Sequence, residues 1–366
     1  MQEGIAAVLR GPGQELTVEK IYVDDPWDDE ILVHVSGSGI CRTDLMFLDN
    51  SIYLPGVYGH EGAGEVVKVG KNVRKVKPGD HVVMSIVYGC GSCIPCRKGA
   101  PMHCVNSKPM ASAQRADGSS AMKDASGQPL SFGHACSFAN YTIAKENAVV
   151  KIDPEMPLEY AGILGCGVQT GSGAVLNAMK PDLFSSIAVY GTGTVGLSAI
   201  MAAKVRKCYP IIAVDINPVK LEMAKTMGAT HVVNSSEGDP VKAIREIVPS
   251  GVDYAVDTVG KSSVTPKVIL STKATGFTVL LGLESMDQTF TIPLYEVINI
   301  NRRIQGVIEG DGIPDICIPQ LVSLHQAGEL PIDKLLTYYN IKDINRALQE
   351  FAAGKTIKPI ILFDEA

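Results

Sequence analysis

The chain has 366 residues, enough for two domains, because single hydrophobic cores stop growing at roughly 250–300 residues. With 46% hydrophobic and 20% charged residues it has the composition of a soluble globular protein, and a net charge of −6 without a basic run argues against nucleic-acid partners. No apolar run is long enough to cross a bilayer, and the first residues lack a signal-peptide pattern, so a reducing cytoplasm is the expected setting.

The sequence pattern of residues 1–87 predicts short β-strands separated by turns. Apolar or alternating runs at 6–9, 31–35, 65–69 and 81–84 are β-like, and glycine, proline and aspartate interrupt them. His34 alternates with apolar neighbours and is interpreted as a structural strand residue. Residues 106–137 are polar and rich in glycine, serine and alanine, which predicts a long loop with little regular structure, either at the mouth of a pocket or disordered.

From residue 187 onward, short apolar strands alternate with helices. Helices are expected up to about residue 206 and over 218–227, and strands at 187–190, 211–215, 231–233, 252–256, 276–281 and 303–307. Such alternation predicts an α/β domain with a parallel, doubly wound sheet. A helix over 315–327 and a strand over 359–363 are expected to return to the first domain.

Four of the nine cysteines lie close together in the pattern C-x2-C-x2-C-x7-C. Two-residue gaps let successive thiolates turn toward one cation, and four thiolates close a tetrahedral zinc site. Disulfides are the alternative, which a reducing compartment disfavours. A closed site offers no position for a substrate, so the predicted role is structural. These ligands are Cys90, Cys93, Cys96 and Cys104, whereas Cys136, Cys208 and Cys317 are interpreted as structural thiols.

A second candidate metal site centres on His60 and Glu61, in the glycine-rich stretch 59–65. By itself this pair is equally compatible with a buried histidine bonded to the main chain. Cys41 upstream and Cys166 far downstream would complete a Cys/His/Cys set, which holds zinc and leaves a fourth position open.

A glycine loop of the form G-x-G-x-x-G follows the strand at 187–190 and opens a helix. Its glycines permit a pyrophosphate to approach the helix N-terminus. Asp215, at the end of the next strand, would bind the ribose hydroxyls and repel a 2′-phosphate, so NAD is preferred over NADP. Lys220 flanks the ribose or is a solvated surface lysine. The expected cofactor contacts in this half of the chain are Gly191, Gly193, Thr194, Val195, Gly196, Asp215 and Lys220, together with Leu281 at the end of a later strand.

With these motifs in place, the chain resembles zinc-dependent alcohol dehydrogenases of the medium-chain dehydrogenase/reductase superfamily over essentially its whole length. The segments 165–171, 309–311 and 357–359 are most similar to the aryl and allylic branch, of benzyl alcohol or geraniol type. The resemblance implies a GroES-like catalytic domain over 1–168 and 309–366, with a structural zinc lobe at 90–104, and a Rossmann NAD-binding domain over 169–308.

The resemblance also implies roles for single residues. Cys41, His60 and Cys166 hold the catalytic zinc; Glu61 lies close behind it, Asp44 orients His60, and Thr43 hydrogen-bonds the substrate oxygen. Arg42 and Lys358 meet the cofactor pyrophosphate, and Thr170 and Val195 pack near the nicotinamide. Zinc lowers the pKa of the alcohol, and a hydride moves to NAD. Met46 replaces the histidine that relays the proton in many relatives, which leaves the exit route open and makes the pocket more apolar.

Two competing interpretations remain at this point. The first is a biosynthetic reductase that uses the same zinc site and NAD(P)H to reduce an aldehyde. The second, from another class, is a non-catalytic protein that binds zinc or a dinucleotide; a metal content of one zinc per chain in place of two would favour it. The resemblance further implies a homodimer or homotetramer that pairs edge strands near 289–301.

Overall fold

The computed structural model describes residues 1–51, 54–106, 115, 117–132, 135–285 and 287–363. It divides into two compact units. The first unit comprises Met1–Cys166, Ile313–Gln326 and Ile332–Ala366, and the second comprises Gly167–Gly312 and Ala327–Pro331. Within the described ranges no helix has the length and apolarity required to cross a bilayer.

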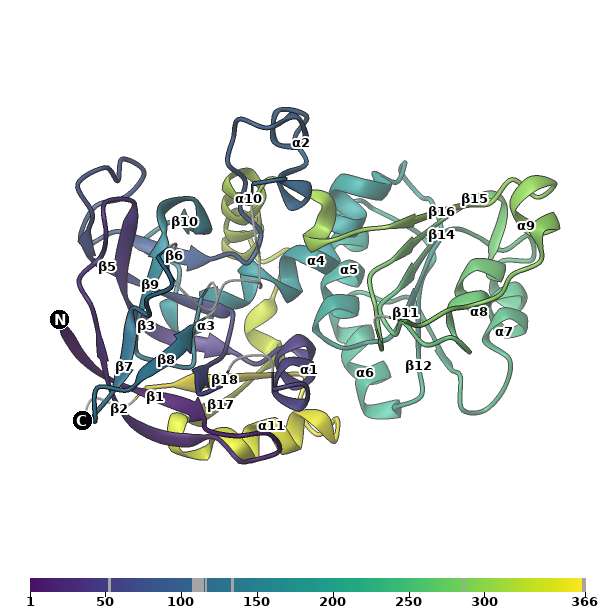
Figure 1. The fold of residues 1–366 in the computed structure, drawn as a ribbon. Coiled ribbons are helices and arrows are strands. Elements are labelled where there is room, and N and C mark those ends of the chain that lie inside the picture. Colours follow the sequence, from purple (N-terminus) through teal and green to yellow (C-terminus); the bar gives the residue numbers. More distant parts are fainter. Residues whose placement is uncertain (52–53, 107–114, 116, 133–134, 286, 364–366) are drawn as a thin grey trace. The chain divides into compact units, whose positions relative to one another are not determined.

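The strands of the first unit form a small closed barrel and a seven-stranded sheet (Figure 1). The barrel follows the order β1 (Gln2–Leu9), β2 (Thr17–Val23), β7 (Met122–Asp124), β8 (Pro129–Phe132) and β4 (Gly56–Val57). The sheet follows the order β10 (Val149–Lys151), β6 (His81–Met84), β5 (Glu61–Val69), β3 (Glu30–Gly39), β18 (Lys358–Leu362) and β17 (Leu336–Asn340), with β9 (Tyr141–Lys145) paired to β3. The strands predicted in the first 87 residues are confirmed, and the strand near the C-terminus returns to this unit as predicted.

Short helices connect these strands. They are α1 (Arg42–Asp49), α2 (Ile94–Arg97), α3 (Leu158–Ala161), α10 (Pro314–Gln326) and α11 (Ile344–Ala352), with the 3-10 turns η1 (Pro101–His103), η2 (Glu146–Ala148), η3 (Gly162–Gly165), η6 (Ile332–Leu335) and η7 (Ile341–Asp343). Buried apolar side chains of the barrel, including Leu9, Ile21 and Leu130, pack with Ile344 of α11 in one core cluster. His34 lies in β3 and stacks on Tyr141 of β9, with ring centroids 4.8 Å apart, so its structural interpretation is confirmed.

The prediction of a loop without regular structure over 106–137 is wrong for part of this segment. Strands β7 and β8 form an antiparallel pair there, and β7 also pairs with β2. Met122 and Leu130 are fully buried, and the Asp124 carboxylate accepts hydrogen bonds from the amides of Ser126 and Gln128 in the turn between the strands. Residues 107–114, 116 and 133–134, which the same prediction covers, lie outside the described residues.

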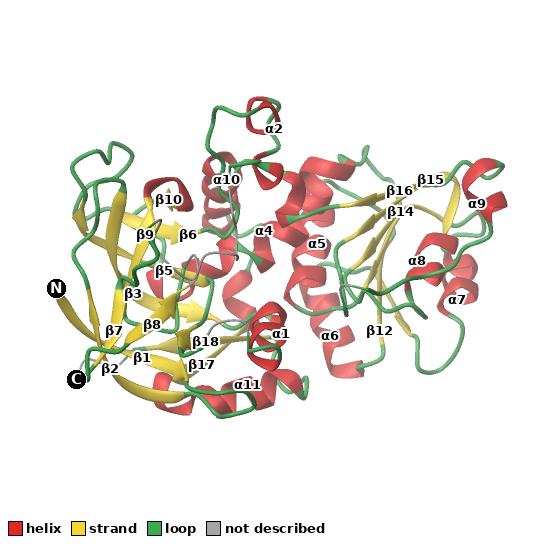
Figure 2. Ribbon diagram, in the orientation of Figure 1, coloured by secondary structure: helices red, strands yellow, loops and turns green. Residues whose placement is uncertain are grey.

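The second unit contains a six-stranded parallel sheet with helices on both faces (Figure 2). The strand order is β13 (His231–Asn234), β12 (Ile211–Asp215), β11 (Ile187–Tyr190), β14 (Val252–Asp257), β15 (Thr272–Leu280) and β16 (Arg303–Gly306). The flanking helices are α4 (Gly167–Gly173), α5 (Thr194–Val205), α6 (Pro218–Met227), α7 (Pro240–Ile247), α8 (Thr265–Leu270) and α9 (Leu294–Ile298), with the π-helical turn η4 (Ala174–Met179) and the 3-10 turn η5 (Glu309–Asp311). The predicted doubly wound α/β sheet is confirmed.

The second unit extends slightly beyond the predicted cofactor domain. Residues 309–312 belong to it, as do residues 167–168 and 327–331, all of which were expected in the first domain. For residues 309–312 the reason is local: the Gly310 carbonyl accepts a hydrogen bond from Asn177 Nδ2 at 3.0 Å, and a Cβ at Gly173 would lie only 2.4 Å from that same carbonyl oxygen. This close backbone contact fixes the segment to α4 and η4.

Candidate active site and metal centres

The ends of three elements bring the candidate catalytic ligands together. Cys41 directly precedes α1, His60 directly precedes β5, and Cys166 directly follows η3. Antiparallel pairing of β3 with β5 places Gly39 opposite Glu61, so the chain leaving β3 passes beside the chain entering β5. The ligand atoms of Cys41, His60, Glu61 and Cys166 all lie within 4.8 Å of one another.

The geometry of this group fits a zinc ion. The sulfurs of Cys41 and Cys166 are 3.9 Å apart, close to the separation of about 3.8 Å that two thiolates take around tetrahedral zinc. Nδ1 of His60 lies 2.8 Å from Oδ1 of Asp44, whereas Nε2 is buried and has no hydrogen-bond partner among the described residues. Buried nitrogens are normally paired, so a cation at Nε2 would complete the site.

Without a metal ion, protonation of His60 supplies the positive charge at this site. Burial lowers the pKa of His60, but the adjacent Asp44 carboxylate and the Cys41 sulfur outweigh it and raise that pKa well above its usual value. The hydrogen bond from the Cys166 thiol, together with His60, lowers the pKa of Cys41 well below its usual value despite burial. The site therefore favours a negative sulfur beside a positive group, which is the charge pattern that a divalent cation would stabilise.

Glu61 and Lys358 form a buried ion pair behind these ligands. The Lys358 ammonium lies 2.6 Å from Oε2 of Glu61 and donates to the Ile40 carbonyl at 2.9 Å. Burial raises the pKa of Glu61, although the Lys358 charge opposes this change. Burial lowers the pKa of Lys358, but the charge of Glu61 outweighs burial, so the pKa of Lys358 is raised. The resemblance implies that Lys358 meets the cofactor pyrophosphate; in the structure its ammonium has two partners inside the first unit.

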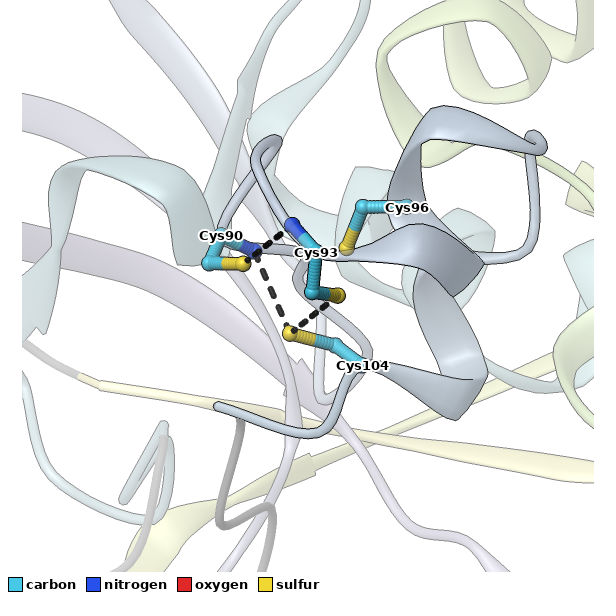
Figure 3. Close-up of side chains that lie close together, drawn as sticks. All are labelled: Cys90, Cys93, Cys96 and Cys104. Carbon is cyan, nitrogen blue, oxygen red and sulfur yellow. Dashed lines mark hydrogen bonds between the residues drawn. The ribbon is translucent and has the colours of Figure 1, made fainter.

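The four cysteines predicted to hold a structural metal are gathered in one lobe, with their sulfurs pointing toward a common centre (Figure 3). All four thiols are free, and the sulfurs of Cys93 and Cys104 are 3.8 Å apart, again the spacing of a zinc site and not of a disulfide. Hydrogen bonds from the Ser92 side chain and from main-chain amides lower the pKa of Cys90 to about 5. Lost hydration and neighbouring thiols raise the pKa of Cys96 to about 12, so four thiolates at this spacing need a cation.

The glycine loop has the shape of a phosphate cradle. Gly191 has φ +86°, and a Cβ at Gly196 would lie 1.8 Å from the Gly191 carbonyl oxygen, so both positions need glycine. A Cβ at Gly193 would meet nothing within 4 Å, which leaves open space where a ligand can approach. Oδ2 of Asp215 accepts hydrogen bonds from the amide and hydroxyl of Thr192, so this carboxylate is fixed beside the loop.

The remaining predicted site residues lie in or next to helices and strands of the two units. Arg42 is exposed at the start of α1, and Thr43 and Met46 are half-buried in the same helix. Thr170 in α4, Val195 in α5, Lys220 in α6 and Leu281 after β15 are also half-buried. Sequence reasoning missed the hydroxyl of Thr192 as a partner of Asp215, although its position inside the loop was a usable signal.

A candidate three-ligand metal site, a four-thiol lobe and a glycine loop on a parallel sheet are together typical of zinc- and dinucleotide-dependent oxidoreductases. Residues 27–154 match the alcohol dehydrogenase GroES-like domain family, and residues 194–327 match the zinc-binding dehydrogenase family. A geraniol dehydrogenase from Castellaniella defragrans is 37% identical over 98% of this chain and 97% of its own length. An S-(hydroxymethyl)glutathione dehydrogenase from Escherichia coli is 34% identical over 98% of this chain and 99% of its own.

Two solved structures agree with these matches. An alcohol dehydrogenase zinc-binding domain protein from Burkholderia ambifaria superposes with a TM-score of 0.96 at 40% identity, covering 100% of both chains. The benzyl alcohol dehydrogenase from Acinetobacter calcoaceticus superposes with a TM-score of 0.95 at 38% identity, also covering 100% of both chains. The chain therefore belongs to the zinc-dependent alcohol dehydrogenases of the medium-chain dehydrogenase/reductase superfamily, close to the aryl and allylic type.

Proposed function

We propose that the chain catalyses the NAD-linked interconversion of a primary aromatic or allylic alcohol and its aldehyde. The observation that carries this proposal is the convergence of two thiols with the unpartnered, buried Nε2 of His60. Two thiolates, one imidazole and an open fourth position are a catalytic ligand set for zinc. When bound, zinc supplies a Lewis acid and NAD supplies a hydride acceptor.

The surrounding side chains have separate tasks. Asp44 holds Nδ1 of His60 and thereby directs Nε2 toward the other ligands. Thr43, two residues after Cys41, would accept a hydrogen bond from the hydroxyl of the alcohol and relay that proton by donating its own. NAD, when bound, would accept the hydride from the alcohol carbon. Met46 lies one helical turn beyond Thr43 and has no titratable group, so water carries the proton onward.

Two observations support an aromatic or allylic substrate. Met46 lies on α1 close to Thr43 and offers an apolar, deformable surface instead of an imidazole. The relatives named for geraniol and benzyl alcohol match the chain over nearly its full length. Reduction of the corresponding aldehyde by NADH is the same reaction in reverse.

The choice of cofactor and the second metal rest on the other two sites. Asp215 stands at the carboxyl end of β12 beside the glycine loop, where its charge would repel a 2′-phosphate, so NAD is the proposed cofactor. The four-thiol lobe takes a second, structural zinc, which gives two zinc ions per chain. A cytoplasmic setting would keep these thiols reduced.

Self-association is part of the proposal. Strand β16 ends the described sheet of the second unit, and an exposed strand edge is a template for pairing with another chain. Helix α9, which precedes it, exposes Leu294, Tyr295 and Ile298 by 69%, 58% and 65%. These features support a homodimer or homotetramer that joins the edges of two such sheets.

The test is NADH formation followed by absorbance at 340 nm, with purified protein and benzyl, cinnamyl, geranyl and ethyl alcohols and S-(hydroxymethyl)glutathione. Fast NAD⁺ reduction with the aromatic or allylic alcohols is expected, and NADP⁺ should be used poorly. Activity confined to ethanol or to S-(hydroxymethyl)glutathione would overturn the substrate assignment. No reduction of either cofactor with any alcohol would overturn the reaction itself.

A further inference from the structure

Parts of two sequence segments that resemble the aryl and allylic branch lie against each other in the second unit. They are residues 167–171 and 309–311, and the proposed reaction gives no role to Gln169 or Glu309. Nε2 of Gln169 lies 3.4 Å from Oε2 of Glu309, although 140 residues separate them. Gln169 is only 1% exposed and Glu309 only 8%, so the amide and the carboxylate meet away from bulk water.

The turn that carries Glu309 has an unusual backbone. Glu309, Gly310 and Asp311 have φ values of +49°, +71° and +52°, and two of these three residues are not glycine. Side chains rarely tolerate this left-handed region, and such residues persist where the surroundings hold them; they are frequent at ligand clamps. Here Asn177 Nδ2 donates to the Gly310 carbonyl, and a Cβ at Gly310 would lie 2.3 Å from the Gln169 carbonyl oxygen.

Helix α4 connects this turn to the phosphate cradle. A Cβ at Gly171 would lie 1.9 Å from the carbonyl oxygen of Val195, so α4 packs closely on the first turn of α5. Gln169, two residues earlier, faces the turn at 309–311. Thr170 lies between these two contacts and is half-exposed. Thr170 and Val195 are the residues expected beside the nicotinamide.

We propose that Gln169 and Glu309 are positioning residues for the nicotinamide half of NAD. Their hydrogen bond helps to hold the turn at 309–311 on α4, and this arrangement sets the position of Thr170, which is expected beside the ring. Oε1 of Gln169 is buried and has no hydrogen-bond partner among the described residues, so the bond to Glu309 is what orients this amide. The inference rests on the proposed use of NAD.

Fluorescence titration of the whole protein with NADH and with ADP-ribose, which lacks the nicotinamide, tests the proposal. Gln169→Met removes the amide that holds Glu309 and should weaken NADH binding about tenfold, because the turn at 309–311 and Thr170 lose their fixed position, while ADP-ribose binding stays unchanged. The exchange variant Gln169→Glu/Glu309→Gln restores an amide–carboxylate bond and should recover NADH affinity to within about threefold. Glu309→Gln keeps the shape of the pair and removes only the charge. It should therefore cause a smaller loss of NADH affinity, again without a change in ADP-ribose affinity.

Ser186→Ala is the matched control. It removes a buried hydroxyl that donates to Asp253 at 2.6 Å, at the amino end of β11, whereas dinucleotides bind at the carboxyl ends of such strands. It should lower stability and leave both affinities unchanged. Three results would overturn the inference. The first is an equal loss of affinity for NADH and ADP-ribose, and the second is unchanged NADH affinity in both Gln169→Met and Glu309→Gln. The third is a folded exchange variant that does not recover NADH affinity. Wild-type protein that binds neither ligand would overturn the proposed cofactor and this inference with it.

Discussion

Lys358 and Glu61 form an ion pair that is almost completely excluded from solvent, with 1% and 0% of their surfaces exposed and 2.6 Å between the charged atoms. Lys358 opens β18, and Glu61 opens β5 directly after the candidate zinc ligand His60. The same ammonium donates to the carbonyl of Ile40, next to the candidate ligand Cys41. One lysine thus ties both ligand-bearing segments to the C-terminal strand.

Replacing this lysine should destabilise the protein strongly. Lys358→Met would leave the Glu61 carboxylate buried without its cation, which costs about 3–5 kcal/mol in comparable pairs. Urea unfolding of the zinc-loaded protein would measure this loss. Lys358→Arg keeps a cation and should lose less. A Lys358→Met protein as stable as the wild type would mean that the pair does not hold these segments together.

Asp44 should control the affinity of the catalytic zinc and leave the lobe untouched. Its carboxylate bonds Nδ1 of His60 and the amide of Cys41, both at 2.8 Å. Loss of such a supporting carboxylate lowers metal affinity about 10–100-fold, so Asp44→Ala should release one zinc per chain to a chelator that leaves the wild type intact. Asp49→Ala, an exposed acid of the same helix, is the control. Equal zinc retention in both variants would argue against the role of Asp44.

The four-thiol lobe should contribute stability and a second metal. Cys104→Ser removes one of four converging sulfurs and should lower the zinc content by one per chain. Because structural zinc contributes to folding free energy, Tm should fall by roughly 6–12 °C in a calorimetric scan. Cys317→Ser, at a buried thiol outside both clusters, should keep all its zinc. An unchanged zinc content in Cys104→Ser would exclude a metal in the lobe.

Asp215 should set the choice between NAD and NADP. The carboxylate also accepts two hydrogen bonds from Thr192, so the informative change is Asp215→Asn, which removes the charge and keeps an acceptor oxygen. We expect the ratio of kcat/KM for NADP⁺ to that for NAD⁺ to rise about 100-fold, because repulsion of the 2′-phosphate is lost. Steady-state rates with both cofactors at 340 nm provide the measurement. A constant ratio would show that selectivity lies elsewhere.

Features that depend on residues close together in the sequence were predictable. The two-residue gaps between the lobe cysteines and the glycine loop after an apolar strand both lie within about fifteen residues, so local spacing was sufficient. The strands of the parallel sheet were also predictable, because strands covered on both faces form continuous apolar runs in the sequence.

Features that depend on distant or very short segments were not predictable. Lys358 and Glu61 are 297 residues apart, and no local pattern shows that the lysine turns inward. Strand β7 has only three residues, too few for an alternating pattern, and the burial of Met122 comes from the barrel around it. The boundary at residue 312 depends on the contact of Gly310 with Gly173, which becomes visible only once the backbone is folded.

The most direct test of the account measures zinc content and NADH formation from benzyl alcohol in the same samples of the wild type and of His60→Ala. We predict two zinc ions per chain and rapid NADH formation for the wild type. The variant should hold one zinc, in the lobe, and form no NADH, because the unpartnered Nε2 of His60 is the third protein ligand. Two zinc ions or undiminished NADH formation in His60→Ala would contradict the assignment of this site as the catalytic metal centre.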